Sequence, residues 1–271
     1  MSTLDLGFSG RYAPFVATMG SPFDDAEFNR RLFYPRRDTS FPPEGAVDRL
    51  IAVPGARLHL RTHRAPGART TILLFHGNGE VVADYDDVAS LFADCGAALA
   101  VVDYRGYGQS DGEPTLKHLV EDGHAVVAAL QEPSIIVMGR SLGSAAAADL
   151  YRSPPPAVLG FIWESGFVDL DALVGRRGLG IEARLPDDLR RAFDPVPKLK
   201  AGHSPLLVIH GSDDDLIAPS EGRAAFDAAG TALKDLVYVP DRGHNDLGTS
   251  PIYWQAIAKF VRERTHADDR A

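Results

Sequence analysis

Ser141 has the sequence setting of a catalytic nucleophile. Residues 139–143 read Gly-Arg-Ser-Leu-Gly, directly after the apolar run 135–138 and directly before an alanine-rich stretch. The Gly-x-Ser-x-Gly pattern alone is weak evidence, because 26 of the 271 residues are glycine. A strand, a tight turn and a helix in succession, however, hold a serine hydroxyl exposed at a strained corner. This context favours a nucleophile over the simpler interpretation of Ser141 as a helix N-cap.

A serine hydroxyl is a poor nucleophile at neutral pH and needs a general base. Residues 210–215, His-Gly-Ser-Asp-Asp-Asp, and residues 241–246, Asp-Arg-Gly-His-Asn-Asp, each follow a late apolar run. An acid after one late strand and a histidine after the next give the chain order Ser, Asp, His that accompanies such a turn. We predict Ser141 as nucleophile, His244 as general base and then general acid, and Asp214 as the carboxylate that orients the imidazole.

Other carboxylates compete for the role given to Asp214. Asp213 or Asp215 would take it if the loop were displaced by one residue. Glu164, which follows the apolar run 158–162, is a second candidate acid. A loop carboxylate bonded to backbone groups is the simpler interpretation of Glu164.

Two further histidines, His76 and His210, each precede a glycine at the end of an apolar run. Orienting the following loop through hydrogen bonds is a simpler role for them than catalysis. They lack the His-x-x-x-His spacing of metal ligands, so a site that joins them to Asp103 or Asp213 is disfavoured. We predict no metal and no cofactor, and a structural role for the turn 103–110.

The elements that must position these residues alternate along the chain. Helical patterns such as 116–130 and 141–151, and a closing helix at 252–264, lie between or after short apolar runs. The runs are 49–53, 57–60, 71–75, 98–102, 135–138, 158–162, 206–209 and 236–239. The first two flank Pro-Gly and predict an antiparallel hairpin, and the later ones are typical of strands buried on both faces. We predict an α/β fold, a mostly parallel doubly wound sheet of about eight strands with helices on both faces.

Two segments depart from this alternation. Residues 1–45 hold six of the 13 phenylalanines among glycines and prolines, and predict an irregular extension docked on the core, with a flap over the binding site as the alternative. Residues 46–271 form the α/β domain. Within it, about 165–204 is rich in Gly, Pro and charged residues and predicts a small lid.

Composition limits the classes of partner. The 37 acidic residues against 28 basic ones give a net charge of -9, which argues against nucleic acid. A transmembrane segment is not expected, because no apolar run approaches about 20 residues. The N-terminus lacks the pattern of a signal peptide, and Cys95 is the one cysteine, so we expect a cytoplasmic protein. The oligomeric state is left open.

Four motifs together resemble the α/β-hydrolase superfamily, and within it the small-lid serine hydrolases of the abhydrolase-domain and serine-aminopeptidase-like esterase group. They are Phe-His-Gly-Asn-Gly at 75–79, Asp-Tyr-Arg-Gly-Tyr-Gly-Gln-Ser at 103–110, the Gly-x-Ser-x-Gly turn, and Gly-His-Asn-Asp at 243–246. The resemblance covers about 50–261. It implies the same triad, and it implies that the backbone N–H groups of Asn78 and Leu142 form an oxyanion hole, where each donor is worth on the order of 10²–10³ in rate.

These observations predict a serine hydrolase that cleaves an ester, thioester or amide bond of a small-molecule acyl substrate. The alternatives are a carbon–carbon bond hydrolase or an acyltransferase on the same triad, and a non-catalytic binding protein with a hydrolase fold. Glu80, Arg140 and Phe167 are candidate substrate contacts. For Arg140, a salt bridge that points away from the site is the competing interpretation.

Overall fold

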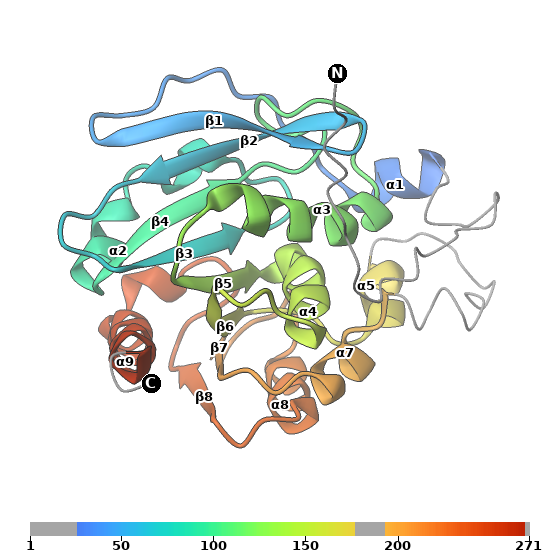
Figure 1. Cartoon of the computed structure of the whole chain (residues 1–271). Coiled ribbons are helices and arrows are strands. Elements are labelled where there is room, and N and C mark those ends of the chain that lie inside the picture. Colours follow the sequence, from blue (N-terminus) through green and yellow to red (C-terminus); the bar gives the residue numbers. More distant parts are fainter. Residues whose placement is uncertain (1–25, 177–192, 269–271) are drawn as a thin grey trace, which may run out of the picture.

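A single eight-stranded sheet organises the computed structural model, which describes residues 26–176 and 193–268. The strand order is β1-β2-β4-β3-β5-β6-β7-β8 (Figure 1). Strand β2 pairs antiparallel with both β1 and β4, and the remaining pairs are parallel. The strands are β1 (Ala46–Val53), β2 (Ala56–His63), β3 (Thr70–Phe75), β4 (Ala97–Val102), β5 (Ile135–Arg140), β6 (Val158–Glu164), β7 (Leu206–Gly211) and β8 (Lys234–Val239). The predicted fold class, including the N-terminal antiparallel hairpin, is confirmed.

Helices cover both faces of the sheet, because the central strands are apolar on both sides. In β3, Leu73 and Phe75 belong to one buried cluster, while Ile72 and Leu74 belong to the other. The first cluster includes side chains of α3 (Leu116–Leu130), α4 (Ser144–Arg152), α7 (Pro195–Ala201) and α8 (Pro219–Ala228). The second includes α2 (Ala89–Asp94) and α9 (Pro251–Asp268), on the other side of the sheet (Figure 1).

Helix boundaries follow local chemistry. Helix α3 has the predicted bounds: the Thr115 hydroxyl accepts a hydrogen bond from the His118 amide at its start, and Gln131 adopts a left-handed conformation at its end. The helix predicted at 141–151 is instead a 3-10 turn, η3 (Ser141–Gly143), followed by α4. The reason is that Ser141 has a φ of 50°, which an α-helix does not accommodate. The closing helix is longer than its predicted range 252–264.

The two irregular segments are described in part. Residues 1–25 and 177–192 lie outside the described residues, so the docked extension (1–45) and the lid (165–204) stay predictions. From residue 26 the chain forms α1 (Ala26–Leu32), after which Phe33 is buried but Phe41 is 92% exposed. Helix α5 (Leu170–Arg176) precedes the undescribed part of the lid range, and α7 lies near the range's end.

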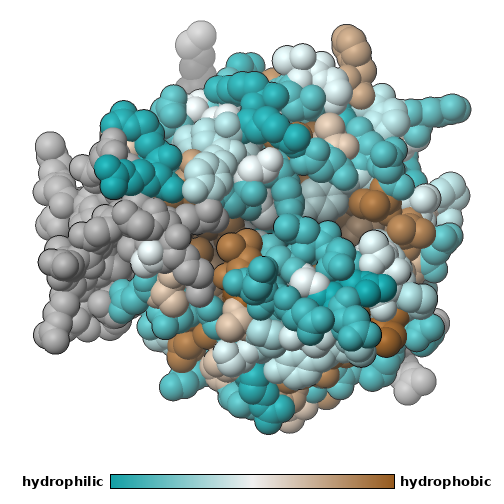
Figure 2. Space-filling view, turned by 180° about the vertical axis from the view of Figure 1, so that it is seen from behind, coloured by the Kyte–Doolittle hydropathy of each residue, from teal (hydrophilic) through white to brown (hydrophobic). Residues whose placement is uncertain are grey.

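One face of the described surface is mainly polar (Figure 2). On the face seen in Figure 2, hydrophobic residues are scattered in small separate groups among hydrophilic ones. Among the helices that the structure describes, none is both long and apolar enough to cross a membrane.

Candidate active site

Ser141 lies at a strained corner directly after β5. Its φ of 50° is uncommon for a residue with a Cβ atom, and such conformations persist only where the surroundings enforce them. The flanking glycines are required by close packing. A Cβ atom on Gly143 would lie 2.0 Å from the Phe75 carbonyl oxygen, and one on Gly139 would lie 2.6 Å from the Cβ atom of Ala147. The corner is therefore pressed against the end of β3, with the serine hydroxyl at the carboxyl edge of the sheet.

The structure brings Ser141, His244 and Asp214 together. The Ser141 Oγ atom lies 2.9 Å from His244 Nε2, and His244 Nδ1 lies 2.8 Å from Asp214 Oδ2. The three residues come from loops that follow β5, β8 and β7, and 103 residues separate the serine from the histidine. They meet because the carboxyl ends of parallel strands share one edge of the sheet.

Asp214 is held as an anion by several donors. Its Oδ1 atom accepts hydrogen bonds from the backbone amides of Leu216 (3.0 Å) and Ile217 (2.8 Å), and Oδ2 lies 3.2 Å from His210 Nε2. Burial acts to raise the pKa of Asp214, but the hydrogen bonds from His210, His244 and the Ile217 amide outweigh it and hold that pKa well below its ordinary value. The carboxylate is therefore ionised at neutral pH and available to orient the imidazole.

The competing carboxylates have other contacts. Asp213 and Asp215 are exposed, and Asp213 Oδ1 accepts a hydrogen bond from the Ser212 hydroxyl. Glu164 is buried, and its Oε2 atom accepts a hydrogen bond from the Tyr253 hydroxyl at 2.8 Å. Of the candidate carboxylates, Asp214 is therefore the one that contacts His244, whereas Glu164 binds the Tyr253 hydroxyl.

The turn after β3 is tied to distant parts of the chain through the side chain of Asn78. Its Oδ1 atom accepts hydrogen bonds from the Tyr34 amide (2.9 Å) and the Tyr107 hydroxyl (2.7 Å), and its Nδ2 atom donates to the Leu32 carbonyl (2.7 Å). Leu142 is buried in η3. The corner that contains Leu142 packs on the start of the Asn78 turn, as the approach of Gly143 to Phe75 requires.

The three candidate substrate contacts touch protein groups. Arg140 Nη1 lies 2.8 Å from Glu80 Oε1, and their side chains are 12% and 23% exposed. Phe167 is fully buried in the core, which does not support a contact with substrate. The salt bridge expected for Arg140 is present, but the guanidinium also donates to the His244 carbonyl oxygen, so it does not point away from the site. Asn245 accepts a hydrogen bond from Arg140. This residue was not singled out from the sequence, although its position directly after His244 indicates that it lies near the site.

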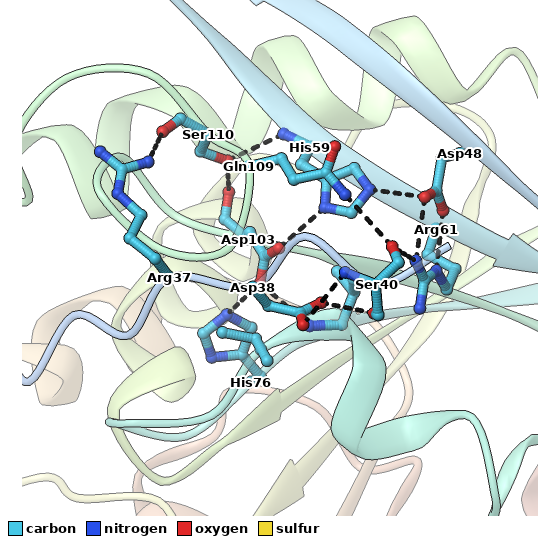
Figure 3. Close-up of polar contacts among 12 residues, drawn as sticks. Arg37, Asp38, Ser40, Asp48, His59, Arg61, His76, Asp103, Gln109 and Ser110 are labelled. Carbon is cyan, nitrogen blue, oxygen red and sulfur yellow. Dashed lines mark hydrogen bonds and ion pairs between the residues drawn. The ribbon is translucent and has the colours of Figure 1, made fainter. Parts of the chain in front are cut away.

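A second polar cluster is centred on the buried Asp103, which contacts His76 directly after β3 (Figure 3). Asp103 Oδ2 lies 2.9 Å from His59 Nδ1, and Oδ1 accepts a hydrogen bond from the Val82 amide and lies 3.4 Å from His76 Nε2. Burial acts to raise the pKa of Asp103, but the contacts with His59 and His76 outweigh it and lower that pKa. These contacts, and the 2.8 Å approach of His76 Nδ1 to the Gly77 carbonyl oxygen, agree with the structural roles predicted for Asp103 and His76. Among the described residues, no group of three or more His, Cys, Asp and Glu side chains is arranged to hold a metal ion.

Comparisons with known proteins agree with this arrangement. A family model described as serine aminopeptidase, S33, matches residues 66–199. The human alpha/beta hydrolase domain-containing protein 17B is 29% identical over 213 residues, which cover 73% of this chain and 68% of that protein. The Xenopus tropicalis protein 17C is also 29% identical, over 73% of this chain and 63% of its own length. The chain thus spans about two thirds of these relatives.

Solved structures share the fold. The Pyrococcus furiosus esterase Pf2001 has a TM-score of 0.69 at 20% identity, over 85% of this chain and 98% of its own. Est1E from Butyrivibrio proteoclasticus, solved with ferulic acid, has a TM-score of 0.64 at 19% identity, over 80% and 99%. The Paleococcus ferrophilus monoacylglycerol lipase has a TM-score of 0.60 at 16% identity, over 76% and 99%. With the fold and the comparisons in agreement, the chain belongs to the α/β-hydrolase superfamily and is a hydrolase.

Proposed function

We propose that this hydrolase cleaves ester bonds by acyl transfer, with Ser141 as nucleophile, His244 as general base and acid, and Asp214 as the orienting carboxylate. The observation that carries the proposal is the unbroken hydrogen-bond chain from the serine oxygen to the carboxylate, with steps of 2.9 Å and 2.8 Å. Each distance is that of a formed hydrogen bond.

The first half of the reaction forms an acyl-enzyme. The Ser141 oxygen attacks the ester carbonyl carbon while its proton passes to His244 Nε2. The resulting imidazolium donates from Nδ1 to Asp214, whose charge stabilises it. The backbone N–H groups of Asn78 and Leu142 hold the oxyanion. When the tetrahedral intermediate collapses, the C–O bond to the leaving group breaks, and the alkoxide takes the proton from His244.

In the second half, water is the nucleophile and Ser141 is the leaving group. His244 removes a proton from a water molecule, whose oxygen attacks the acyl carbon. Collapse of this second tetrahedral intermediate breaks the bond from the acyl carbon to Ser141 Oγ and releases the carboxylic acid. The proton then returns from His244 to Ser141 Oγ. His244 carries each transferred proton, and the only other reactant is water. The scheme therefore uses no cofactor. Esters are favoured over amides because solved structures with this fold include an esterase and a lipase. The family model is nevertheless that of an aminopeptidase.

The test combines a covalent probe with a substrate series. A fluorophosphonate is expected to label the wild-type protein at Ser141, and Ser141→Ala is expected to remain folded and unlabelled. His244→Ala should lower turnover by several orders of magnitude. Folded wild-type protein that takes no label would refute the proposal. p-Nitrophenyl esters of increasing chain length, run beside small peptides, distinguish ester from amide hydrolysis, and a carbon–carbon bond hydrolase would turn over neither well.

A cytoplasmic location remains part of this proposal. It is supported by the presence of one cysteine, Cys95, which is buried and fits a reducing compartment. Fractionation of the source cells tests it.

A further inference from the structure

Arg140, the residue before the nucleophile, is the centre of a buried charge cluster beside the triad. It ends β5 opposite Glu164 of β6 in the strand register. Its side chain is 12% exposed, which is low for an arginine. A buried guanidinium is stable only when its donors are paired, so its partners define its role.

The Arg140 guanidinium bonds in three directions. Its Nη1 atom lies 2.8 Å from Glu80 Oε1, and its Nε atom lies 3.2 Å from Glu164 Oε1. Its Nη2 atom donates to the His244 carbonyl oxygen at 3.3 Å and to Asn245 Oδ1 at 3.0 Å. One planar group therefore spans β6, the turn after β3 and the loop that carries the general base.

Glu80 extends this connection to the proposed oxyanion hole. Its Oε2 atom accepts hydrogen bonds from the Gly77 amide at 2.8 Å and from the Tyr85 hydroxyl at 2.6 Å. Burial acts to raise the pKa of Glu80, but the charge of Arg140 and the Tyr85 hydroxyl outweigh it, so the carboxyl is held ionised. Gly77 immediately precedes Asn78. The charge pair therefore fixes the peptide next to the proposed oxyanion donor.

We propose that Arg140 is a positioning residue that holds the His244 loop and the Asn78 turn at a fixed separation around Ser141. This inference rests on the proposed function, because it assigns Arg140 to the same site. Arginine suits the role since its five donors point outward in a rigid fork, whereas the single ammonium group of lysine presents three donors from one point. Lysine at this position keeps the charge but does not reach all three directions.

The expected effect is on rate rather than on substrate affinity. A misplacement of about 1 Å between reacting groups costs about 10²-fold in rate. We expect Arg140→Lys to slow fluorophosphonate labelling and to lower kcat for a p-nitrophenyl ester by about 10- to 100-fold, with KM within about threefold. Asn245→Ala, which removes one of the two bonds to the His244 loop from an exposed side chain, should lower the same rates about 3- to 10-fold.

Active-site titration separates positioning from simple loss of structure. Each variant is labelled to completion, and kcat is expressed per labelled site, so unfolded protein does not contribute. The matched control is Arg223→Lys on α8, where the exposed Arg223 pairs with Asp227 at 3.0 Å. This control should keep wild-type rates.

A chemical rescue and a double variant give independent readings. Guanidinium ion, far below the concentrations that unfold proteins, should restore part of the labelling rate to Arg140→Ala. The variant Glu80→Gln combined with Asn245→Ala should lose less rate than the product of the two single losses, because both bonds act through Arg140. A double loss equal to that product would show that the two loops are fixed independently.

The outcomes distinguish this inference from the proposed function. If the wild-type protein takes no label, the proposed function fails. If it is labelled at Ser141 while Arg140→Lys keeps its labelling rate and kcat per site within threefold of wild type, the function stands and the positioning role is refuted. If Arg140→Lys does not fold, Asn245→Ala decides the question: unchanged rates per site overturn the proposal.

Discussion

Replacing Asp214 by asparagine removes the negative charge behind His244 while it preserves the size of the side chain. The asparagine carbonyl oxygen is expected to take the place of Oδ1, which accepts hydrogen bonds from the amides of Leu216 (3.0 Å) and Ile217 (2.8 Å). The NH₂ group then lies opposite His244 Nδ1, where Oδ2 lies at 2.8 Å in the native protein. Because that group donates, the imidazole must carry its proton on Nε2. An Nε2–H facing Ser141 does not accept the serine proton.

The magnitude follows from this reversal of the imidazole tautomer. Loss of the correct tautomer costs on the order of 10⁴ in kcat when the oxyanion hole remains intact. At 1.36 kcal/mol per tenfold, this is about 5 kcal/mol of transition-state stabilisation. The carboxylate is ionised across the working range, because its pKa lies well below the ordinary value of about 3.9. Acidification from pH 8 to pH 5 therefore leaves Asp214 charged and does not reproduce the loss.

The assay is the rate of fluorophosphonate labelling together with kcat/KM for a p-nitrophenyl ester at pH 8. The control is Asp215→Asn, the same chemical change at the adjacent exposed position, which we expect to stay within about twofold of wild type, as for a surface substitution. If Asp214→Asn retains activity within tenfold of wild type, or if Asp215→Asn falls as far, the assignment of the orienting carboxylate is wrong.

Two predictions concern stability. Gly143→Ala should lower the free energy of unfolding, measured in urea, by about 3 kcal/mol or more, because its Cβ atom would lie 2.0 Å from the Phe75 carbonyl oxygen. Gly175→Ala on α5, where a Cβ atom meets no described residue within 4 Å, should instead stabilise by up to about 1 kcal/mol; equal effects would contradict the packing argument. Burial opposes ionisation of Asp149, but hydrogen bonding and the charge of Lys198 at 3.0 Å lower its pKa to about 2. This folded-state pKa lies below the unfolded value of about 3.9. Above about pH 3.9, ionised Asp149 therefore adds about 2 kcal/mol to the free energy of unfolding, and this contribution is lost as the pH falls through about 2. Asp149→Asn should therefore lower Tm at pH 5 to 7, and the difference from wild type should shrink toward pH 2; a difference that grows on acidification would refute this.

Periodic patterns in the sequence predicted the sheet, the helix α3, and the helices α4 and α9 apart from their ends. The apolar runs of the central strands β3 to β7 were visible because a strand buried on both faces needs apolar residues at nearly every position. The bounds of α3 agree with the helical pattern predicted over 116–130, and the structure adds the Thr115 cap at its start. These signals are local: they lie within the element that they describe, so one sequence reveals them.

Some boundaries and contacts depended on packing between distant segments. The helix after β5 begins with a 3-10 turn because the Ser141 corner packs against the end of β3 with a positive φ. The Gly-x-Ser-x-Gly motif predicted a strained corner, but the residue at which the α-helix begins depends on this packing. Phe41 showed the same limit, since its type suggested burial and the structure leaves it exposed.

The sequence by itself determined the α/β architecture and narrowed the proposed site to Ser141, His244 and a carboxylate from one of three adjacent aspartates or from Glu164. Only the tertiary structure decided that Asp214 is the one that contacts His244. Neighbouring side chains in a loop point in different directions, and that direction is set by amide donors downstream and by His210. The partners of Arg140 were likewise invisible, since they come from segments brought together only when parallel strands align their carboxyl ends.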